Sequence, residues 1–323
     1  MYTICVCPAM SIAGVSRLRS KPAMATGKVR VGAVMTRGEV AAPVMVNAGQ
    51  STSPPTKIIR RTTVTDIKIV FFDVDGTLLG HGQRSLPASL IAALKKARQR
   101  NVKLVICTGR RPQELQCLSD FDFDAFLTMN GQVCFTRNEI LRLNPIPRTD
   151  IETLLDLIDA DPFPVSFSEL GRAYINFHTE KSNELYAMCG VVPPILVDDV
   201  RHEALTHEVY QLNFFTTPEH EREILTHLPG SMSRRWGDLH SDIFALSDGK
   251  KDGVKAALKF YGINPENALS FGDGENDIDM FELTAYSVAM GNASDTVKSA
   301  ATYVTKPFNQ GGILEGLTKY GVV

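Results

Sequence analysis

The sequence contains no run of eighteen apolar residues and carries almost no net charge, with 34 lysines and arginines against 36 aspartates and glutamates. The first absence excludes a membrane-spanning helix, and the second excludes the strongly basic surface typical of nucleic-acid-binding proteins. The six cysteines form neither C-x-x-C pairs nor a dense framework, which indicates free thiols in a reducing compartment. We therefore expect a cytoplasmic protein. Of its 323 residues, 44% are apolar, which is enough to build a buried core.

Residues 1–65 differ in composition from the remainder of the chain. They hold nine basic residues and one acidic residue, Glu39, and they end in a turn-forming stretch that contains Pro54 and Pro55. No helical or strand period is sustained over them. An organellar transit segment, a disordered tail and a wrongly assigned start codon all share this composition, so the three interpretations stay open. A transit segment would change the expected location to an organelle.

From residue 66 onward, buried strands alternate with amphipathic helices. Strands are predicted at the apolar runs 67–72, 102–107, 125–129, 268–271 and 287–290. Helices are predicted between them, at 85–99, from 112 onward, at 253–261 and at 277–283. Because strand–helix–strand connections build parallel sheets, we predict an α/β fold with a Rossmann-like parallel core.

The middle of the chain, residues 148–238, follows a different pattern. Helical patterns at 151–158, 180–188 and 219–228 are mixed with strand patterns at 164–177 and 209–215. This mixture is typical of a small α+β domain. We therefore predict a core domain of residues 66–147 and 239–323, interrupted by an inserted domain of residues 148–238. Hinges between the two domains are expected near 145–147 and 233–238.

Two carboxylates directly follow the first predicted strand, in the string Asp73-Val74-Asp75-Gly76-Thr77. Ligands of open α/β sheets bind at the carboxyl ends of the strands, and the glycine lets the chain turn sharply there. At average residue usage, a D-x-D-G-T string arises by chance about once in a few hundred chains of this length. This loop is therefore the first candidate for chemistry.

The string resembles the opening motif of the haloacid dehalogenase (HAD) superfamily, and the other motifs of that superfamily follow in order. Thr108-Gly109-Arg110 ends the second predicted strand, and Gly272-Asp273-Gly274-Glu275-Asn276-Asp277 follows a late strand. The lysine motif has two candidates, Lys250 and Lys251, and the spacing to the following helix favours Lys250. The resemblance covers residues 66–323.

The spacing of these motifs also places the inserted domain. Only 33 positions separate Asp75 from Thr108, whereas 142 separate Thr108 from Lys250. The insertion therefore falls between the second and third motifs, which corresponds to a C2-type cap. With the T-G-R triplet and the Asn130-Gly131 pair, the chain resembles the Cof-type, class IIB phosphatases.

Phosphoryl transfer requires an in-line nucleophile, a proton for the leaving oxygen and neutralisation of the phosphoryl charge. In the predicted site Asp73 attacks phosphorus and forms an aspartyl-phosphate, while Asp75 acts first as an acid and then as a base. Neighbouring carboxylates repel each other and a phosphate dianion, so a hard cation is required, and Mg²⁺ is the natural choice. The resemblance implies metal ligands from Asp73, the main-chain carbonyl of Asp75, and Asp273.

The remaining motif residues are expected to hold the phosphoryl group and the surroundings of the metal. Phosphate and substrate contacts are expected from Thr108, Gly109, Arg110, Lys250 and Asn276. Asp277 is expected to hold the lysine and the waters on the metal. Asp279, on the next helix, is expected to face solvent.

These features predict a Mg²⁺-dependent phosphatase that acts on small phosphorylated metabolites, most readily sugar phosphates. A phosphomutase of the same superfamily would share both aspartates, and a non-catalytic protein that binds small phosphorylated molecules would keep the fold. A cleft closed by a cap suits small enclosed ligands, so neither a nucleic acid nor a membrane is an expected partner. The sequence leaves the oligomeric state open.

Overall fold

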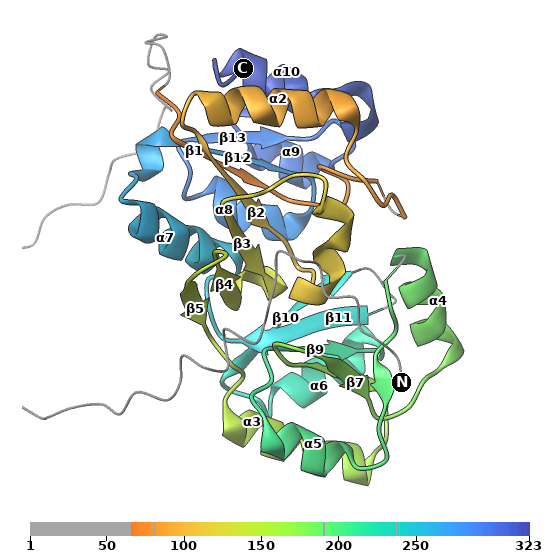
Figure 1. The fold of residues 1–323 in the computed structure, drawn as a ribbon. Coiled ribbons are helices and arrows are strands. Elements are labelled where there is room, and N and C mark those ends of the chain that lie inside the picture. Colours follow the sequence, from red (N-terminus) through yellow and green to blue (C-terminus); the bar gives the residue numbers. More distant parts are fainter. Residues whose placement is uncertain (1–65, 81, 190, 237, 239) are drawn as a thin grey trace, which may run out of the picture.

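A computed structural model describes residues 66–323, apart from residues 81, 190, 237 and 239 (Figure 1). The three interpretations of residues 1–65 concern a segment outside the described residues. The described chain forms two parts, each built on its own sheet.

The larger part, the core, contains a sheet of eight described strands. In sheet order they are β14 (Tyr303–Val304), β13 (Tyr286–Ala289), β12 (Ala268–Gly272), β1 (Ile69–Phe72), β2 (Lys103–Cys107), β3 (Ala125–Thr128), β4 (Val133–Phe135) and β5 (Ile140–Leu143). The strands from β14 to β3 are parallel, and β4 and β5 add an antiparallel hairpin. The predicted α/β class with a parallel core sheet is therefore confirmed.

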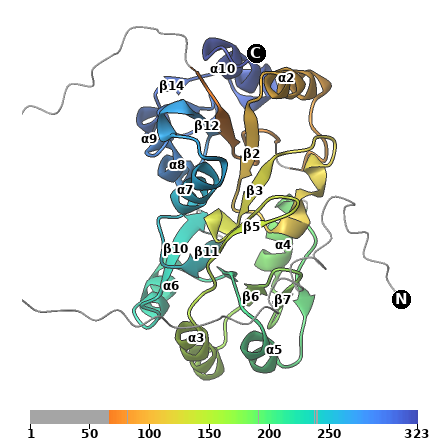
Figure 2. The same ribbon diagram turned by 60° about the vertical axis from the view of Figure 1, so that its left-hand side comes forward.

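Helices cover both faces of this sheet because alternate residues of each strand point to opposite sides. Val70 and Phe72 of β1 pack with α2 (Ala88–Gln99) and α10 (Gly312–Lys319). Ile69 and Phe71 pack instead with α7 (Lys250–Tyr261), α8 (Ile278–Phe281) and α9 (Asp295–Ala300), which lie together in Figure 2.

Short 3₁₀ helices complete the core connections. They are η1 (Pro112–Leu118), η2 (Met129–Gly131), η3 (Pro265–Asn267), η4 (Glu275–Asp277) and η5 (Phe308–Gln310). The helix predicted from residue 112 is thus a 3₁₀ helix, and the helix predicted at 277–283 is split between η4 and α8.

The smaller part, called the cap below, is an inserted domain with a sheet of six described strands, mostly antiparallel. In sheet order they are β10 (Ser231–Trp236), β11 (His240–Ala245), β9 (Gln211–Phe214), β6 (Val165–Ser168), β7 (Ala173–Ile175) and β8 (Ile195–Leu196). One face is covered by α3 (Arg148–Ala160), α5 (Val200–Thr206) and α6 (Pro218–Leu225). The other face turns toward the core, with α4 (Glu180–Cys189) packed at its side (Figure 1).

The insertion ends later than the sequence predicted. Strand β11 pairs with β9 and β10, so the cap sheet extends to Ala245 and the boundary at residue 238 falls inside a hairpin. A hinge at 233–238 is also wrong, because most of that segment is β10, held along its length by β11. The sequence of β11, in which polar residues precede apolar ones, does not indicate which sheet the strand joins. The chain crosses between the two parts at 144–147 and 246–249.

The two crossings meet at one side chain. Gln132, which is fully buried, accepts a hydrogen bond from Asn144 Nδ2 (2.8 Å) in the first crossing. Its own amide donates to Ser247 Oγ (3.0 Å) in the second. The entry to and the exit from the cap therefore lie side by side.

Candidate active site

Three loops meet where β1, β2 and β12, neighbours at the centre of the core sheet, come to an end. They carry Asp73 and Asp75, the triplet 108–110, and the acidic segment 273–277. Hydrogen bonds join the loops, since Arg110 contacts Asp75 and Thr77 contacts Asp273. The structure thus brings the predicted site residues together.

The tight turn after β1 depends on Gly76. Its φ of +79° lies in the left-handed region, and a Cβ at this position would overlap the Asp273 carboxylate. The close approach lets Thr77 Oγ1 donate to Asp273 Oδ1 (2.8 Å). Asn292 Nδ2 donates to Asp273 Oδ2 (3.1 Å) and to the Gly76 carbonyl (2.9 Å). Sequence reasoning missed Asn292, because no motif connects it with Asp273, 19 positions away, or with Gly76, 216 positions away.

Of the two candidate lysines, the structure places Lys250 in the site. Its side chain is fully buried, and Nζ lies 2.6 Å from Oδ1 of Asp73 and 2.6 Å from Oδ1 of Asp277. Lys251 points away and pairs with Glu282 at 2.9 Å. Lys250 begins α7, so the helix fixes the position of this ammonium group at the carboxyl end of the sheet.

Burial and crowding by carboxylates dominate the electrostatics of the site. Burial alone would lower the pKa of Lys250, but the carboxylates of Asp277 and Asp73 outweigh it and raise that pKa above its ordinary value. Burial raises the pKa of Asp73, against the effect of Lys250 and with that of the neighbouring carboxylates. Burial likewise raises the pKa of Asp273 to about 6, although the hydrogen bond from Thr77 lowers it. A cation placed here would relieve this repulsion.

The carboxylates fit a hard divalent ion. Asp73, Asp273 and Asp277 each offer an oxygen, and the three oxygens lie within 4.8 Å of one another. Oxygen ligands at this spacing suit Mg²⁺. Asp277 is already engaged, because Oδ1 accepts from Lys250 and Oδ2 accepts from the main-chain N–H groups of Asp273 (2.8 Å) and Gly274 (2.9 Å). Asp73 and Asp273 are therefore the better direct ligands, with Asp277 as their support.

The loop after β2 supplies a hydroxyl and a guanidinium. Thr108 is buried, and its Oγ1 accepts a hydrogen bond from the Arg110 main-chain N–H (3.1 Å). The Arg110 side chain donates to both carboxylate oxygens of Asp75, at 2.7 and 2.6 Å, and to the carbonyl of Glu114 (3.1 Å). Burial alone would lower the pKa of Arg110, but the hydrogen bonds to Asp75 and its negative charge outweigh burial and raise that pKa. The residue expected to touch substrate thus contacts the expected acid and base.

Asn276 faces the cap side of the site. Its Nδ2 donates to Asn130 Oδ1 (3.0 Å), and Asn130 Nδ2 donates to Asp242 Oδ2 (3.2 Å) on β11 of the cap. Sequence reasoning used Asn130 only as part of a signature pair and did not single out Asp242. A second contact between the two parts is the pair of Arg234 on β10 and Asp279 (3.3 Å). Asp279 therefore does not face solvent as expected.

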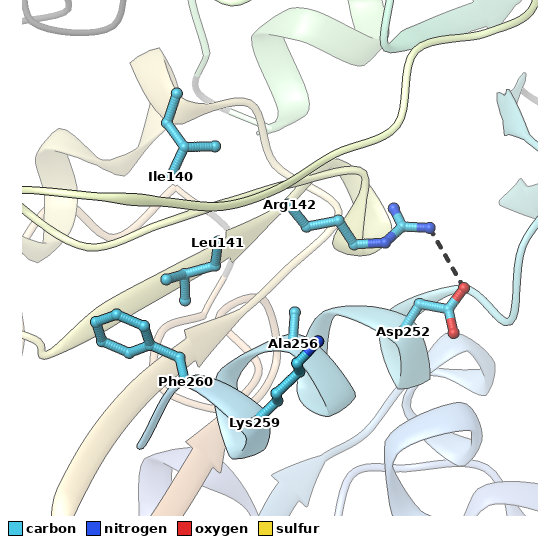
Figure 3. A pocket seen from close by; sticks show the side chains of 7 residues that line it. All are labelled: Ile140, Leu141, Arg142, Asp252, Ala256, Lys259 and Phe260. Carbon is cyan, nitrogen blue, oxygen red and sulfur yellow. Dashed lines mark hydrogen bonds and ion pairs between the residues drawn. The ribbon is translucent and has the colours of Figure 1, made fainter. Parts of the chain in front are cut away.

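A separate cavity of about 560 Å³ opens between β5 and α7 (Figure 3). It is lined by Ile140, Leu141, Arg142, Asp252, Ala256, Lys259 and Phe260. Arg142 and Asp252 form an ion pair at 3.3 Å across it. None of these residues belongs to the predicted site, so this cavity is distinct from the place where the three loops meet.

No helix in the described part of the chain is long and apolar enough to cross a membrane.

What the loops assemble is an enclosed group of carboxylates with one lysine and one arginine at the edge of a parallel sheet. Such a set can hold a cation, bind an anionic group and move a proton.

Comparison with known proteins agrees with this geometry. Residues 70–317 match the family model described as haloacid dehalogenase-like hydrolase. The Bacillus subtilis protein YkrA is 28% identical over 261 residues, which cover 80% of this chain and 99% of YkrA.

Two solved structures are similar over most of their length. BT1666 of Bacteroides thetaiotaomicron, described among phosphatases of the HAD superfamily, superimposes with a TM-score of 0.75 at 29% identity, covering 82% of this chain and 99% of BT1666. BT4131, described as a HAD subclass IIB sugar phosphatase, superimposes with a TM-score of 0.71 at 33% identity, covering 79% of this chain and all of BT4131. The chain therefore belongs to the haloacid dehalogenase-like hydrolases, in the Cof-type, class IIB branch that its motifs indicated.

Proposed function

We propose that this protein is a Mg²⁺-dependent phosphatase that hydrolyses small phosphorylated metabolites, sugar phosphates first among them. The observation that carries the proposal is the placement of Asp73, which lies at the end of the central strand with Lys250 on one side and Asp273 within reach of a shared cation. An anionic substrate can approach the Asp73 carboxylate only if positive charges, here Lys250 and the cation, lie beside it.

In the first step an oxygen of Asp73 attacks phosphorus, and the bond from phosphorus to the leaving oxygen breaks. Asp75 gives its proton to that oxygen, so the product leaves as an alcohol. Lys250 and the hydroxyl of Thr108 stabilise the charge on the phosphoryl oxygens as it shifts. The product of the step is an aspartyl-phosphate at Asp73.

In the second step water attacks the same phosphorus atom. Asp75, now a carboxylate, takes the proton from the water, and the bond between phosphorus and Asp73 breaks. Inorganic phosphate leaves, and both aspartates return to their starting state. Arg110 supports this second step, in which it holds the Asp75 carboxylate at the edge of the site.

Asp73 and Asp273, with the main-chain carbonyl of Asp75, would hold the Mg²⁺ ion, and Asp277 would orient the site around it. When bound, the ion would neutralise charge on the phosphoryl group and on the two carboxylates. Burial first, and neighbouring carboxylates after it, raise the pKa values of Asp73 and Asp273, and a bound cation would favour the ionised form of both groups.

Two considerations support a small sugar phosphate as substrate. The structurally similar BT4131 is described as a sugar phosphatase. The cap also contacts the core beside the site loops, through the pairs Asn130–Asp242 and Arg234–Asp279, which favours ligands small enough to be enclosed.

The experiment is phosphate release from a panel of sugar phosphates, pyridoxal phosphate and flavin mononucleotide, with Mg²⁺ and with a chelator. The protein is compared with Asp73→Asn and with Asp122→Asn, a control at a half-exposed carboxylate on the core surface. We expect Mg²⁺-dependent turnover that Asp73→Asn abolishes and Asp122→Asn leaves intact. Turnover that survives Asp73→Asn would overturn the nucleophile assignment. A requirement for a sugar bisphosphate would favour the phosphomutase, and phosphate binding without turnover would favour a binding protein.

A further inference from the structure

A chain of buried hydrogen bonds leads from the acidic loop 273–277 across to the cap sheet. Asn276 donates to Asn130 (3.0 Å), and Asn130 donates to Asp242 Oδ2 (3.2 Å). On the cap side, Asn213 Nδ2 donates to Asp242 Oδ1 (2.6 Å). Asn276, Asn130 and Asp242 are at most 9% exposed, so water cannot readily replace these bonds. A buried polar group that loses its partner carries the full cost of its desolvation.

Asn130 has the conformation of a junction between the two domains. Its φ of 53° and the φ of 50° at Met129 both lie in the left-handed region, which is uncommon outside glycine. Its side-chain oxygen accepts from the core, and its side-chain N–H donates to the cap. Turning the amide around would place oxygen against a carboxylate and N–H against a donor, so both bonds depend on one orientation. Backbone strain held at such a point indicates a functional constraint.

Asp242 lies beside the loop that follows β2. A Cβ placed on Gly109 would lie 3.5 Å from Asp242 Oδ2 and 3.4 Å from the Asn130 amide. One amide donor to this carboxylate comes from the cap, Asn213, and one comes from the core, Asn130. The buried charge therefore keeps both donors only while the cap lies against the core.

We propose that Asp242 is a positioning residue that completes the phosphoryl-transfer site when the cap closes. Asp242 fixes the side chain of Asn130, and Asn130 in turn fixes that of Asn276. The next residue, Asp277, accepts a hydrogen bond from Lys250 and so holds it beside Asp73. Coupling of this kind is reciprocal, so an ordered acidic loop also favours a closed cap. The effect on catalysis rests on the proposed function, whereas the coupling between cap and loop does not.

Two single variants and their combination test the chain of hydrogen bonds. In Asp242→Asn, one of the two donors faces an N–H group, and Asn213→Asp leaves two carboxylates in contact. In the double variant, the amide at position 242 accepts from Asn130 and donates to the carboxylate at position 213, with the net charge unchanged. The hydroxyl of Ser166, which donates to residue 213 (2.9 Å), keeps its acceptor. Asp156→Asn, at an exposed carboxylate of cap helix α3, is the matched control.

Two readouts are needed. The first is kcat and KM for the best substrate of the panel. The second is hydrogen exchange of peptides that cover 129–131 and 273–277 in the full chain without substrate. We expect each single variant to lower kcat by about tenfold or more with a smaller change in KM, within the range of typical coupling between sites. Exchange should become faster in both peptides, and the double variant should restore both readouts.

The outcomes separate the proposal from its alternatives. Faster exchange at 129–131 without any change at 273–277 would overturn it, since Asp242 would then be purely structural. A folded double variant that restores neither readout would also overturn it. If no protein in the set, including the wild type, releases phosphate, the proposed function fails, and the exchange data alone decide the coupling.

Discussion

Arg110 donates to both carboxylate oxygens of Asp75, at 2.7 and 2.6 Å. The same guanidinium donates to the main-chain carbonyl of Glu114 (3.1 Å), so it is held from both sides. A two-pronged contact fixes the plane of a carboxylate as well as its position. The geometry favours a role for Arg110 in orienting the acid and base of the proposed reaction, ahead of the direct substrate contact that the motif predicted.

Replacing Arg110 with lysine keeps the positive charge but removes the planar guanidinium that donates to both oxygens of Asp75. Losing one charge-assisted hydrogen bond costs about 1.5–3 kcal/mol, so we expect kcat to fall about ten- to hundredfold, with a smaller change in KM. Steady-state kinetics would measure this, with the half-exposed Arg137→Lys as control. A raised KM at unchanged kcat would instead support the direct substrate contact.

Replacing Lys250 with methionine should abolish turnover and destabilise the fold. It leaves the buried carboxylates of Asp73 and Asp277 without their shared cation, and breaking a buried ion pair costs about 3–5 kcal/mol. Lys251→Met removes a surface pair with Glu282 and should change the free energy of unfolding by less than about 1 kcal/mol. Denaturant unfolding of both variants checks the contrast. Equal changes in the free energy of unfolding for the two variants would show that the ammonium group of Lys250 does not stabilise the fold.

Stabilisation by Mg²⁺ should depend on pH through Asp273. Its pKa in the folded protein is raised to about 6 from 3.8, so without metal the fold gains from this proton at low pH and loses that gain as pH rises through about 6. The ion must displace the proton to bind. We therefore expect Mg²⁺ to raise Tm more at about pH 7.5 than at about pH 5. Asp273→Asn should remove this difference, and a Tm shift independent of pH would argue against Asp273 as a ligand.

His240 on β11 should make the protein sensitive to acid. Burial, with a smaller contribution from Arg235, lowers its pKa to about 4. The unfolded chain binds this proton at about pH 6.5, so the stability is full above that pH and is lost as pH falls toward 4, by about 3 kcal/mol. His240→Gln should flatten the decline in the free energy of unfolding between these values. The exposed His227→Gln should keep the wild-type slope. Parallel slopes for all three proteins would refute the assignment.

The core strands and the meeting of the site loops could be predicted because both follow from local patterns. An apolar run followed by Asp73 identifies a strand and the loop at its carboxyl end, and the spacing chose Lys250 over Lys251. What failed required knowledge of pairing across the chain. Residues 240–245 fall in the predicted core domain without a predicted strand, yet they form β11 of the cap sheet, and Asn292 has no motif to mark it. The contacts Arg110–Asp75 and Arg234–Asp279 likewise depend on the folded arrangement of distant loops.

Gln132, which contacts both crossings between core and cap, bears on how such a protein could arise. Because the two ends of the insertion meet at one buried amide, the core strand order is the same whether or not residues 148–245 lie between them. Domains with adjacent ends are readily inserted into a host chain. One recombination event at this point could therefore exchange the whole cap, and with it the choice of substrate, while the carboxylates and the lysine of the core were inherited unchanged.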